Sequence, residues 1–269
     1  MSLSIEHKHR VVRITLNRPE KRNALTSAMC AGIVEAIRSA QDDRHVGSIL
    51  LCAAGPVFCS GMDVSEALSM SHSELANLHD DLFSIGFHSK KPIVVSVGGA
   101  ALGGGVGLVA QGHVVLASEN SVFGLSEIRL GLWPFLVYRS VEAAVGARRM
   151  LELSLTGRTF HAHDALLWGL VHQVCPPAET SDRARGVAKE LAKLSPAAVE
   201  AGLEYYHRSR GTSWEEAGKL AAQLRVHLME GEDLKEGFAA FKQKREPRWP
   251  SMPPEFYEKH SAPNNGPER

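Results

Sequence analysis

The chain of 269 residues has no formal net charge, because 30 lysine and arginine residues balance 30 aspartate and glutamate residues. Without a basic excess, the chain as a whole is not attracted to nucleic acid or to an anionic membrane, although the net charge says nothing of local patches. The sequence also lacks CxxC pairs, a G-x-S-x-G nucleophile elbow and a Walker-type phosphate loop. We expect its scattered cysteines to be free thiols in a reducing compartment: Cys30, Cys52, Cys59 and Cys175.

One long segment has no Asp, Glu, Lys or Arg at all, namely the stretch between Lys91 and Glu119. Glycine recurs throughout this segment and contributes little to transfer into lipid, so we interpret the segment as buried protein interior and not as a membrane span. Residues 1–8 contain no apolar run of signal-peptide length. We therefore expect a cytoplasmic chain with neither a membrane nor a nucleic acid as its partner.

Short β-branched runs alternate with helical patterns through the first half of the chain. The runs at 11–16, 48–52 and 93–97 are typical of strands, whereas apolar residues recur every four positions within 27–43, as in an amphipathic helix. Strands that alternate with helices predict an α/β fold with a parallel sheet and right-handed crossovers. After about residue 138 the pattern becomes mainly helical.

The pattern predicts three parts: a core at 1–194, a helical region at 195–246 and a Pro-rich tail at 247–269. Ser195 and Pro196 are typical of a helix start, because serine caps the first turn and proline tolerates its first position. The tail holds six prolines and few apolar residues, so we expect it to be loosely ordered.

Three glycine-containing motifs carry the chemical signal. Residues 58–63 (FCSGMD) follow a strand and a turn, residues 98–105 (GGAALGGG) follow a strand and open a helix, and residues 123–131 (FGLSEIRLG) come after a further short strand. Glycines between a strand and a helix let the backbone approach a ligand and present free N–H groups to negative charge. Taken singly, each motif is equally well explained as a tight turn.

Together with residues 16–25 (LNRPEKRNAL), 165–171 (ALLWGLV) and 236–241 (EGFAAF), these motifs resemble those of the crotonase family, also called the enoyl-CoA hydratase/isomerase superfamily. The resemblance runs in order from about residue 3 to residue 246. It implies a spiral of ββα units, a C-terminal helical region for trimerisation and an acyl-CoA thioester as the substrate. Coenzyme A would enter as part of the substrate, with no separate cofactor, and the assembly would be a homotrimer or a dimer of trimers.

The resemblance assigns an oxyanion hole to the backbone N–H groups of Met62 and Gly104. Removal of a proton beside a thioester builds an enolate, which two fixed N–H donors stabilise, and losing one such donor costs about 3–4 kcal/mol. The helix that Gly104 opens adds its dipole to that donor. Since the backbone supplies both donors, the side chain of Met62 is not required for the hole.

Hydratases of this family carry two glutamates, and the chain keeps one of them. Glu127 matches the second, whereas Gly107 occupies the position of the first. Two carboxylates can hold a water molecule and divide base and acid duties across a double bond. A single carboxylate can instead lift a proton from one carbon and return it to another, so Glu127 with an oxyanion hole favours a Δ3,Δ2-enoyl-CoA isomerase over a standard hydratase.

The resemblance also assigns residues to the binding of substrate and coenzyme A. Lysine and arginine side chains suit the phosphates of coenzyme A, although they can equally well solvate a turn. Trp133 and Phe135 would line the acyl pocket or pack beneath it. The expected binding residues are Lys21, Arg22, Ala24, Ser60, Asp63, Val64, Gly103, Trp133 and Lys244.

Several alternatives stay open at this point. The enzyme could be a hydratase with a non-standard second acid or base, for which Glu119 is a weak candidate because its surroundings are typical of a polar turn. The chain could also bind acyl-CoA without turnover. A remote alternative is an NAD-binding oxidoreductase, since residues 105–110 fit G-x-G-x-x-A, but those glycines lie too far beyond their strand. We expect no metal site, because His161 and His163 lack further ligands.

Overall fold

The computed structural model describes residues 1–67 and 71–260. The strands are β1 (Leu3–Lys8), β2 (Val11–Leu16), β3 (Ser48–Ala53), β4 (Val57–Cys59), β5 (Ile93–Val97), β6 (Ala100–Leu102), β7 (Val114–Ser118), β8 (Val122–Gly124), β9 (Thr159–His161) and β10 (Gln173–Cys175). The helices are α1 (Ser27–Asp42), α2 (Val64–Ala67), α3 (His72–Ser84), α4 (Gly104–Val109), α5 (Phe135–Val145), α6 (Ala147–Thr156), α7 (Ala162–Trp168), α8 (Thr180–Leu191), α9 (Pro196–Arg208), α10 (Trp214–Glu230), α11 (Glu232–Gln243) and α12 (Glu255–His260). Three short 3₁₀ helices are η1 (Pro19–Lys21), η2 (Ile85–His88) and η3 (Glu127–Leu130).

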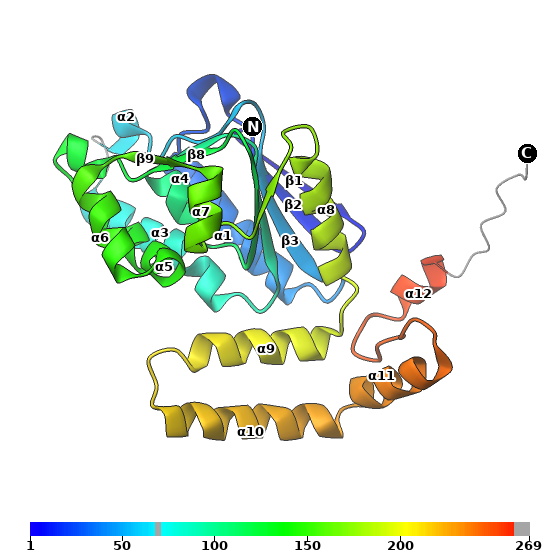
Figure 1. Ribbon diagram of the computed structural model, residues 1–269. Helices are drawn as coiled ribbons and strands as arrows, with labels where there is room; N and C mark the ends of the chain where they lie inside the picture. The colour runs from blue at the N-terminus through cyan, green and yellow to red at the C-terminus, as the bar shows by residue number, and fades with distance from the viewer. Residues whose placement is uncertain (68–70, 261–269) are drawn as a thin grey trace, which may run out of the picture.

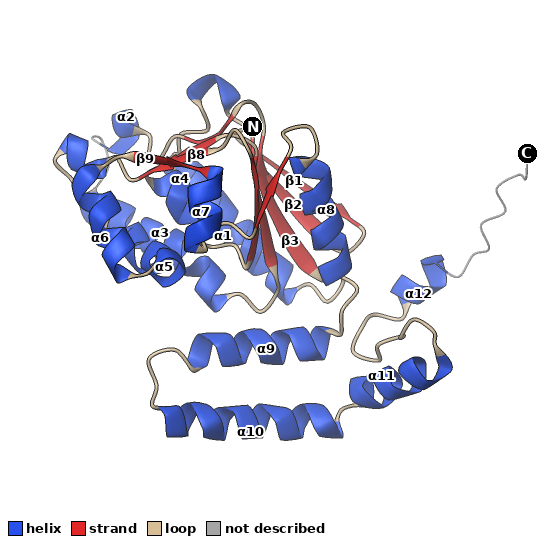
Figure 2. Ribbon diagram, viewed as in Figure 1, coloured by secondary structure: helices blue, strands red, loops and turns tan. Residues whose placement is uncertain are grey.

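The larger sheet has the strand order β1-β2-β3-β5-β7-β10 and is parallel apart from the β1–β2 pair. Helices cover both of its faces, with α8 on one side and α1 on the other (Figures 1 and 2). Strand residues alternate between these faces: in β3, Leu50 packs toward α8, whereas Ile49 and Leu51 pack into the main core. Burial on both faces explains why these strands are continuous apolar runs in the sequence.

The smaller sheet has the order β4-β6-β8-β9 and brings the three glycine motifs together. Strands β4, β6 and β8 pair in parallel, so their carboxyl ends lie at one edge of the sheet. The first motif begins within β4 and the third within β8, and the second motif contains β6, so each runs on beyond the carboxyl end of its strand. Segments that lie far apart in the sequence therefore meet at this edge. Sequence analysis did not predict β4 and β6, which are strands of only three residues.

The C-terminal helices extend away from the core, as the predicted helical region implies. Helices α9 and α10 run antiparallel beneath the core in Figure 1, and α11 follows beside them. Ser195 caps α9 as predicted, because its side chain accepts a hydrogen bond from the backbone N–H of Ala198 at 3.1 Å. Within residues 1–67 and 71–260, no helix combines the length and the apolar character that a membrane span requires.

The tail is more firmly held than its composition suggests. Asp233, which is 8% exposed, accepts hydrogen bonds from Ser195 Oγ at 2.5 Å and from the Ser251 backbone N–H at 2.9 Å. The Trp249 ring N–H donates to the Lys193 carbonyl at 2.8 Å, and Met252 is 2% exposed. The expectation of loose order is therefore wrong for residues 247–252, because hydrogen bonds attach this segment to the rest of the chain although it has few apolar residues. Residues 261–269 lie outside the described residues.

The contacts of Asp233 generate a stability prediction. Hydrogen bonds to a charged group contribute about 1.5–3 kcal/mol each, and Asp233→Ala also leaves Ser195 and Ser251 without their buried partner. We expect the substitution to lower the free energy of unfolding by about 2–3 kcal/mol, measured by denaturant titration. Glu190→Ala is the control, because it removes an exposed carboxylate paired with Lys193 and should change stability by less than about 0.5 kcal/mol. Equal effects of the two substitutions would contradict the structural role of Asp233.

Candidate active site

A cavity of about 320 Å³ lies where the three motifs meet. The segments after β4, β6 and β8 form one side of it, and the start of α5 and one face of α3 form the other. Its lining consists of Leu25, Ser60, Gly61, Met62, Val64, His79, Phe83, Gly103, Gly104, Ser126, Glu127, Leu130, Leu132, Trp133, Pro134, Phe135, Leu136 and Val137. Eight of the residues expected from the sequence line this cavity: Ser60, Met62, Val64, Gly103, Gly104, Glu127, Trp133 and Phe135.

The two predicted oxyanion donors lie on segments that approach each other closely. Gly61 has φ +97°, and a Cβ at this position would lie 3.1 Å from the Leu102 carbonyl oxygen and 3.6 Å from the Gly104 nitrogen. A side chain would therefore push the two segments apart, and glycine permits both the contact and the conformation. The close approach places the backbone N–H of Met62 and that of Gly104 at the same end of the cavity.

A bridge to Leu25 sets the direction of the Met62 amide. The Leu25 N–H donates to the Gly61 carbonyl at 2.8 Å, and the Asp63 N–H donates to the Leu25 carbonyl at 2.8 Å. Because backbone groups alternate in an extended segment, the Met62 N–H faces away from Leu25. Within the described residues, neither the Met62 N–H nor the Gly104 N–H donates to another protein group. Both therefore stay available to an oxygen of a ligand.

Glu127 is the first residue of η3 and presents its carboxylate to the cavity. Its Oε2 is buried without a hydrogen-bond partner among the described residues. Burial penalises the charged form and therefore raises the pKa of Glu127 above its usual value. A Cβ at Gly103 would lie 3.1 Å from Glu127 Oε1, so the carboxylate lies directly against the glycine turn that leads to Gly104. Such a carboxylate is placed to take up a proton beside the oxyanion donors.

The position of the missing glutamate is filled by other side chains. Gly107 lies in α4, and a Cβ there would be 2.8 Å from two ring atoms of Phe83 and would overlap Val137 Cγ1. Since real Cβ atoms do not approach heavy atoms this closely, no larger side chain fits at Gly107 unless its neighbours move. The apolar side chains that occupy this space exclude a second carboxylate from it.

Sequence analysis missed His79, the one histidine that lines this cavity within the described residues. His79 lies on α3, is 8% exposed, and its ring centroid is 5.8 Å from that of Phe83. Burial lowers the pKa of His79, so the neutral imidazole is favoured. The available signal was the helical spacing of His79 and Phe83, four residues apart, which places both side chains on one face of α3.

Asp63 forms an ion pair with Arg18 and thereby stabilises the loop beside the cavity. Arg18 Nη1 contacts Asp63 Oδ2 at 2.6 Å, and the Asp63 side chain is 13% exposed. Hydrogen bonds from Ser65 and from Arg18 lower the pKa of Asp63 to about 2. Asn23 holds the same loop, because it is fully buried and donates to the carbonyls of Ala54 and Val57 at 2.9 and 2.8 Å. The loop at 16–25 is thus fixed against the first glycine motif.

The remaining residues expected to bind coenzyme A lie outside the lining of the cavity. Lys21 and Arg22 are exposed on the loop that contains η1, and Ala24 follows them. Lys244 is exposed at the end of α11. Cationic side chains at such positions are free to meet phosphates in solvent, and their role stays a prediction.

The position of the G-x-G-x-x-A glycines in helix α4 argues against the NAD-binding alternative. Gly105 and Gly107 lie inside α4, where a dinucleotide fingerprint would need the glycines in the loop before the helix. Over residues 1–67 and 71–260, no group of three or more His, Cys, Asp or Glu side chains is arranged to hold a metal ion.

The chain is similar over most of its length to a known family. The family model described as "Enoyl-CoA hydratase/isomerase" matches residues 6–252. A putative enoyl-CoA hydratase of Thermus thermophilus is 32% identical over 92% of this chain and 100% of its own length. A probable enoyl-CoA hydratase of Rhizobium meliloti is 34% identical over 91% of this chain and 96% of its own.

Solved structures of enoyl-CoA hydratases have a fold similar to that of this chain. The crystal structure of an enoyl-CoA hydratase of Mycobacterium smegmatis superposes with a TM-score of 0.88 at 29% identity, covering 93% of this chain and 99% of that one. The human enoyl coenzyme A hydratase domain-containing protein 3 matches equally well, with a TM-score of 0.88 at 29% identity, over 93% of this chain and 100% of that one. The chain therefore belongs to the enoyl-CoA hydratase/isomerase family and has the crotonase fold, and that family acts on acyl-CoA thioesters.

The buried carboxylate generates a pH prediction. If Glu127 is the base, kcat/KM falls as the pH drops through the Glu127 pKa, which burial places above the ordinary 4.5. Glu127→Gln should lower kcat by about 10²–10⁴-fold and abolish this acid limb. Glu119→Gln is the control, because Glu119 lies in an exposed turn and the substitution should leave both the rate and the limb unchanged. An unaltered acid limb in Glu127→Gln would exclude Glu127 as the base.

Proposed function

We propose that the chain is a Δ3,Δ2-enoyl-CoA isomerase in which Glu127 is the one proton-transferring carboxylate. The observation that carries the proposal is the packing of Phe83 against Gly107, which leaves no space for the second glutamate of a hydratase. Among the described residues, Glu127 is the one acidic side chain that lines the cavity. One carboxylate suffices to move a double bond, whereas the addition of water across it uses a base and an acid.

The proposed reaction uses the groups of the cavity in order. The Met62 and Gly104 N–H groups bind the thioester oxygen, and the Glu127 carboxylate takes a proton from C2 of a 3-enoyl-CoA. The electron pair left on C2 is delocalised onto the thioester oxygen, where the two donors stabilise the negative charge. The protonated Glu127 then returns the proton to C4, and the double bond comes to lie between C2 and C3. Burial raises the pKa of Glu127, which makes its carboxylate a stronger base for the uptake of the C2 proton.

A hydratase with a non-standard second acid or base is the alternative, and two observations favour it. The relatives described above carry the name enoyl-CoA hydratase. His79 lines the cavity that holds Glu127, and a neutral imidazole can accept or donate a proton. A protein that binds acyl-CoA without turnover is the third candidate, and it predicts that the wild type binds the thioester without converting it and that Glu127→Gln leaves this binding unaffected.

We also propose that the chain assembles as a homotrimer or a dimer of trimers in the cytoplasm. The support is the apolar surface of the C-terminal helices, where Trp214 is 86%, Phe238 67% and Phe241 85% exposed. Phe238 and Phe241 are three residues apart on α11 and so share one face of that helix, and exposed apolar faces of this kind are typical of protein–protein contacts. Lys244 follows Phe241 closely, so the predicted contact with coenzyme A would then be made near a subunit boundary.

A pair of assays tests the reaction class. We expect conversion of a 3-enoyl-CoA to the 2-enoyl isomer, followed by the absorbance of the conjugated thioester, and slow or no addition of water to a 2-enoyl-CoA. The reason is that, within the described residues, no second carboxylate lines the cavity beside that of Glu127. Rapid hydration of the 2-enoyl substrate with no double-bond shift in the 3-enoyl substrate would overturn the isomerase in favour of the hydratase.

Restoring the missing glutamate gives a second test. Gly107→Glu should not create hydratase activity, because the new side chain meets Phe83 and Val137, and it should destabilise the fold by about 1–3 kcal/mol. Gly218→Glu is the matched control, since a Cβ at Gly218 meets nothing within 4 Å and glutamate is a better helix former than glycine. Efficient hydration by a stable Gly107→Glu variant would contradict the packing argument.

A further inference from the structure

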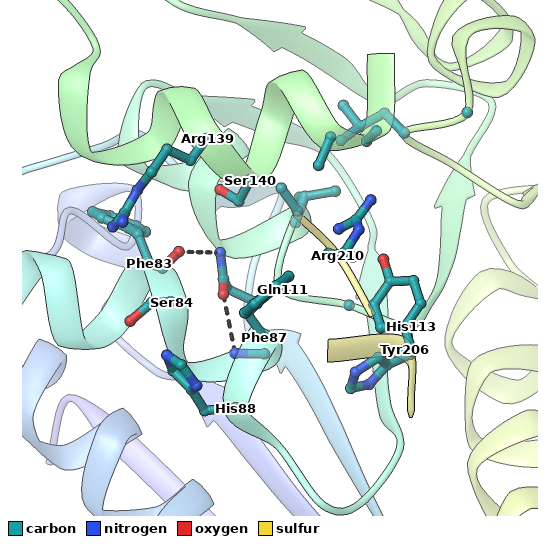
Figure 3. A pocket seen from close by; sticks show the side chains of 18 of the residues that line it. Phe83, Ser84, Phe87, His88, Gln111, His113, Arg139, Ser140, Tyr206 and Arg210 are labelled. Atoms are coloured by element: carbon teal, nitrogen blue, oxygen red, sulfur yellow. Dashed lines mark hydrogen bonds between the residues drawn. The ribbon is translucent and has the colours of Figure 1, made fainter. Parts of the chain in front are cut away.

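A second cavity, of about 760 Å³, lies along the same helices that line the candidate active site (Figure 3). Helix α3 contributes His79 to the active-site cavity and Ser84 to the second. Helix α5 likewise contributes Leu136 to the first and Ser140 to the second. The two cavities therefore follow each other along these helices, and one partition separates them.

Phe83 is that partition, because within the described residues it is the one residue that lines both cavities. Its side chain is buried, with 6% exposed. The ring atom Cζ is 3.2 Å from the position of a Cβ at Gly104, and two further ring atoms are 2.8 Å from that of a Cβ at Gly107. The ring thus lies across α4, from the oxyanion end of the active site toward the second cavity.

Hydrogen bonds hold the backbone of Phe83 in place. Gln111 Nε2 donates to the Phe83 carbonyl at 2.8 Å and to the Gly107 carbonyl at 3.1 Å, and Gln111 Oε1 accepts from the Gly86 N–H at 3.0 Å. Figure 3 shows Gln111 between Phe83 and the start of η2. Val137 closes the other side of the ring, where it shares the space beside Gly107. The ring is therefore fixed in the position that divides the cavities.

We propose that Phe83 closes the acyl end of the active site and makes this chain selective for short-chain acyl-CoA thioesters. The inference rests on the proposed function, because it requires an acyl-CoA in the active-site cavity. That cavity of about 320 Å³ is at the lower end of the range for ligand pockets, and it has to hold the thioester as well as the acyl group. A longer acyl chain meets the ring of Phe83.

The space beyond the ring would accept an acyl tail if the ring were removed. Apolar groups line much of it, among them Val109, Leu170 and Leu203. Among its polar side chains, Gln111 is hydrogen-bonded as described above, and the guanidinium carbon of Arg210 is 4.8 Å from the centroid of the Tyr206 ring. His113 Nδ1 accepts from the Ile93 N–H, whereas its buried Nε2 has no partner among the described residues. A methylene chain can therefore lie here without leaving the buried amide of Gln111 unpaired.

The test measures how affinity depends on chain length. Saturated acyl-CoAs from butanoyl to dodecanoyl do not react, so calorimetric titration reports binding alone. We expect the affinity of the wild type to fall at least about tenfold between butanoyl-CoA and decanoyl-CoA, since a pocket discriminates about tenfold or more per misfitting methylene. In Phe83→Ala, decanoyl-CoA should gain about tenfold or more while butanoyl-CoA changes less than about threefold.

Three further variants complete the design. Phe87→Ala makes the same truncation on the wall of the second cavity and should leave the profile unchanged. Ala144→Phe, added to Phe83→Ala, refills the second cavity and should remove the gain. Phe83→Leu keeps an apolar side chain and should shift the profile in the same direction by a smaller factor, which keeps the test decisive if Phe83→Ala does not fold.

The outcomes separate the two proposals. A wild type that binds decanoyl-CoA as tightly as butanoyl-CoA would overturn the role of Phe83. Folded Phe83 variants whose affinities depend on chain length as in the wild type would overturn it too. The latter result is expected if a neighbouring subunit fills the second cavity. Either result leaves the isomerase assay untouched. Failure of every acyl-CoA to bind would overturn the proposed function itself.

Discussion

The parallel pairing of β4, β6 and β8 is the constraint on which the site depends. These strands are short and would contribute little as isolated elements, but their pairing brings three distant glycine turns to one edge. There Gly61 lies against the backbone of Leu102 and Gly104, an approach that any side chain would prevent. Two backbone N–H groups are thereby left facing one cavity. The chemistry of the site follows from this arrangement of main chain more than from any side chain except Glu127.

The burial of Glu127, in contrast to the strand pairing, destabilises the fold, because it removes a carboxylate from water. Its Oε2 has no partner among the described residues, and the charged form is disfavoured in such surroundings. Nearby, Asp63 is held charged by Arg18 and Ser65, with its pKa lowered to about 2. These two acidic residues thus have opposite environments. The carboxylate of Asp63 is held ionised and fastens a loop, whereas burial disfavours the charged form of Glu127.

Much of the fold could be predicted from the sequence, because apolar runs such as 93–97 and the helical period of 27–43 report burial directly. The motifs and the residues beside them also predicted eight of the cavity residues. His79, Phe83 and Val137 were missed because their importance lies in what they face, and side chains on α3 and α5 meet α4 through tertiary packing alone. The tail was misjudged for a related reason: Asp233 fixes Ser251 by hydrogen bonds, which composition does not register.

The filled space beside Gly107 also bears on how such a site can change over generations. Loss of a carboxylate from this position requires one substitution, after which neighbouring apolar groups can settle into the vacated volume and increase packing. Reversal then requires several coordinated replacements, because Phe83 and Val137 now stand where the carboxylate would lie. A variant with only the glutamate would be overpacked, and a variant with only smaller side chains at Phe83 and Val137 would contain a cavity. A carboxylate could therefore return to this position only if Phe83 and Val137 changed together with Gly107.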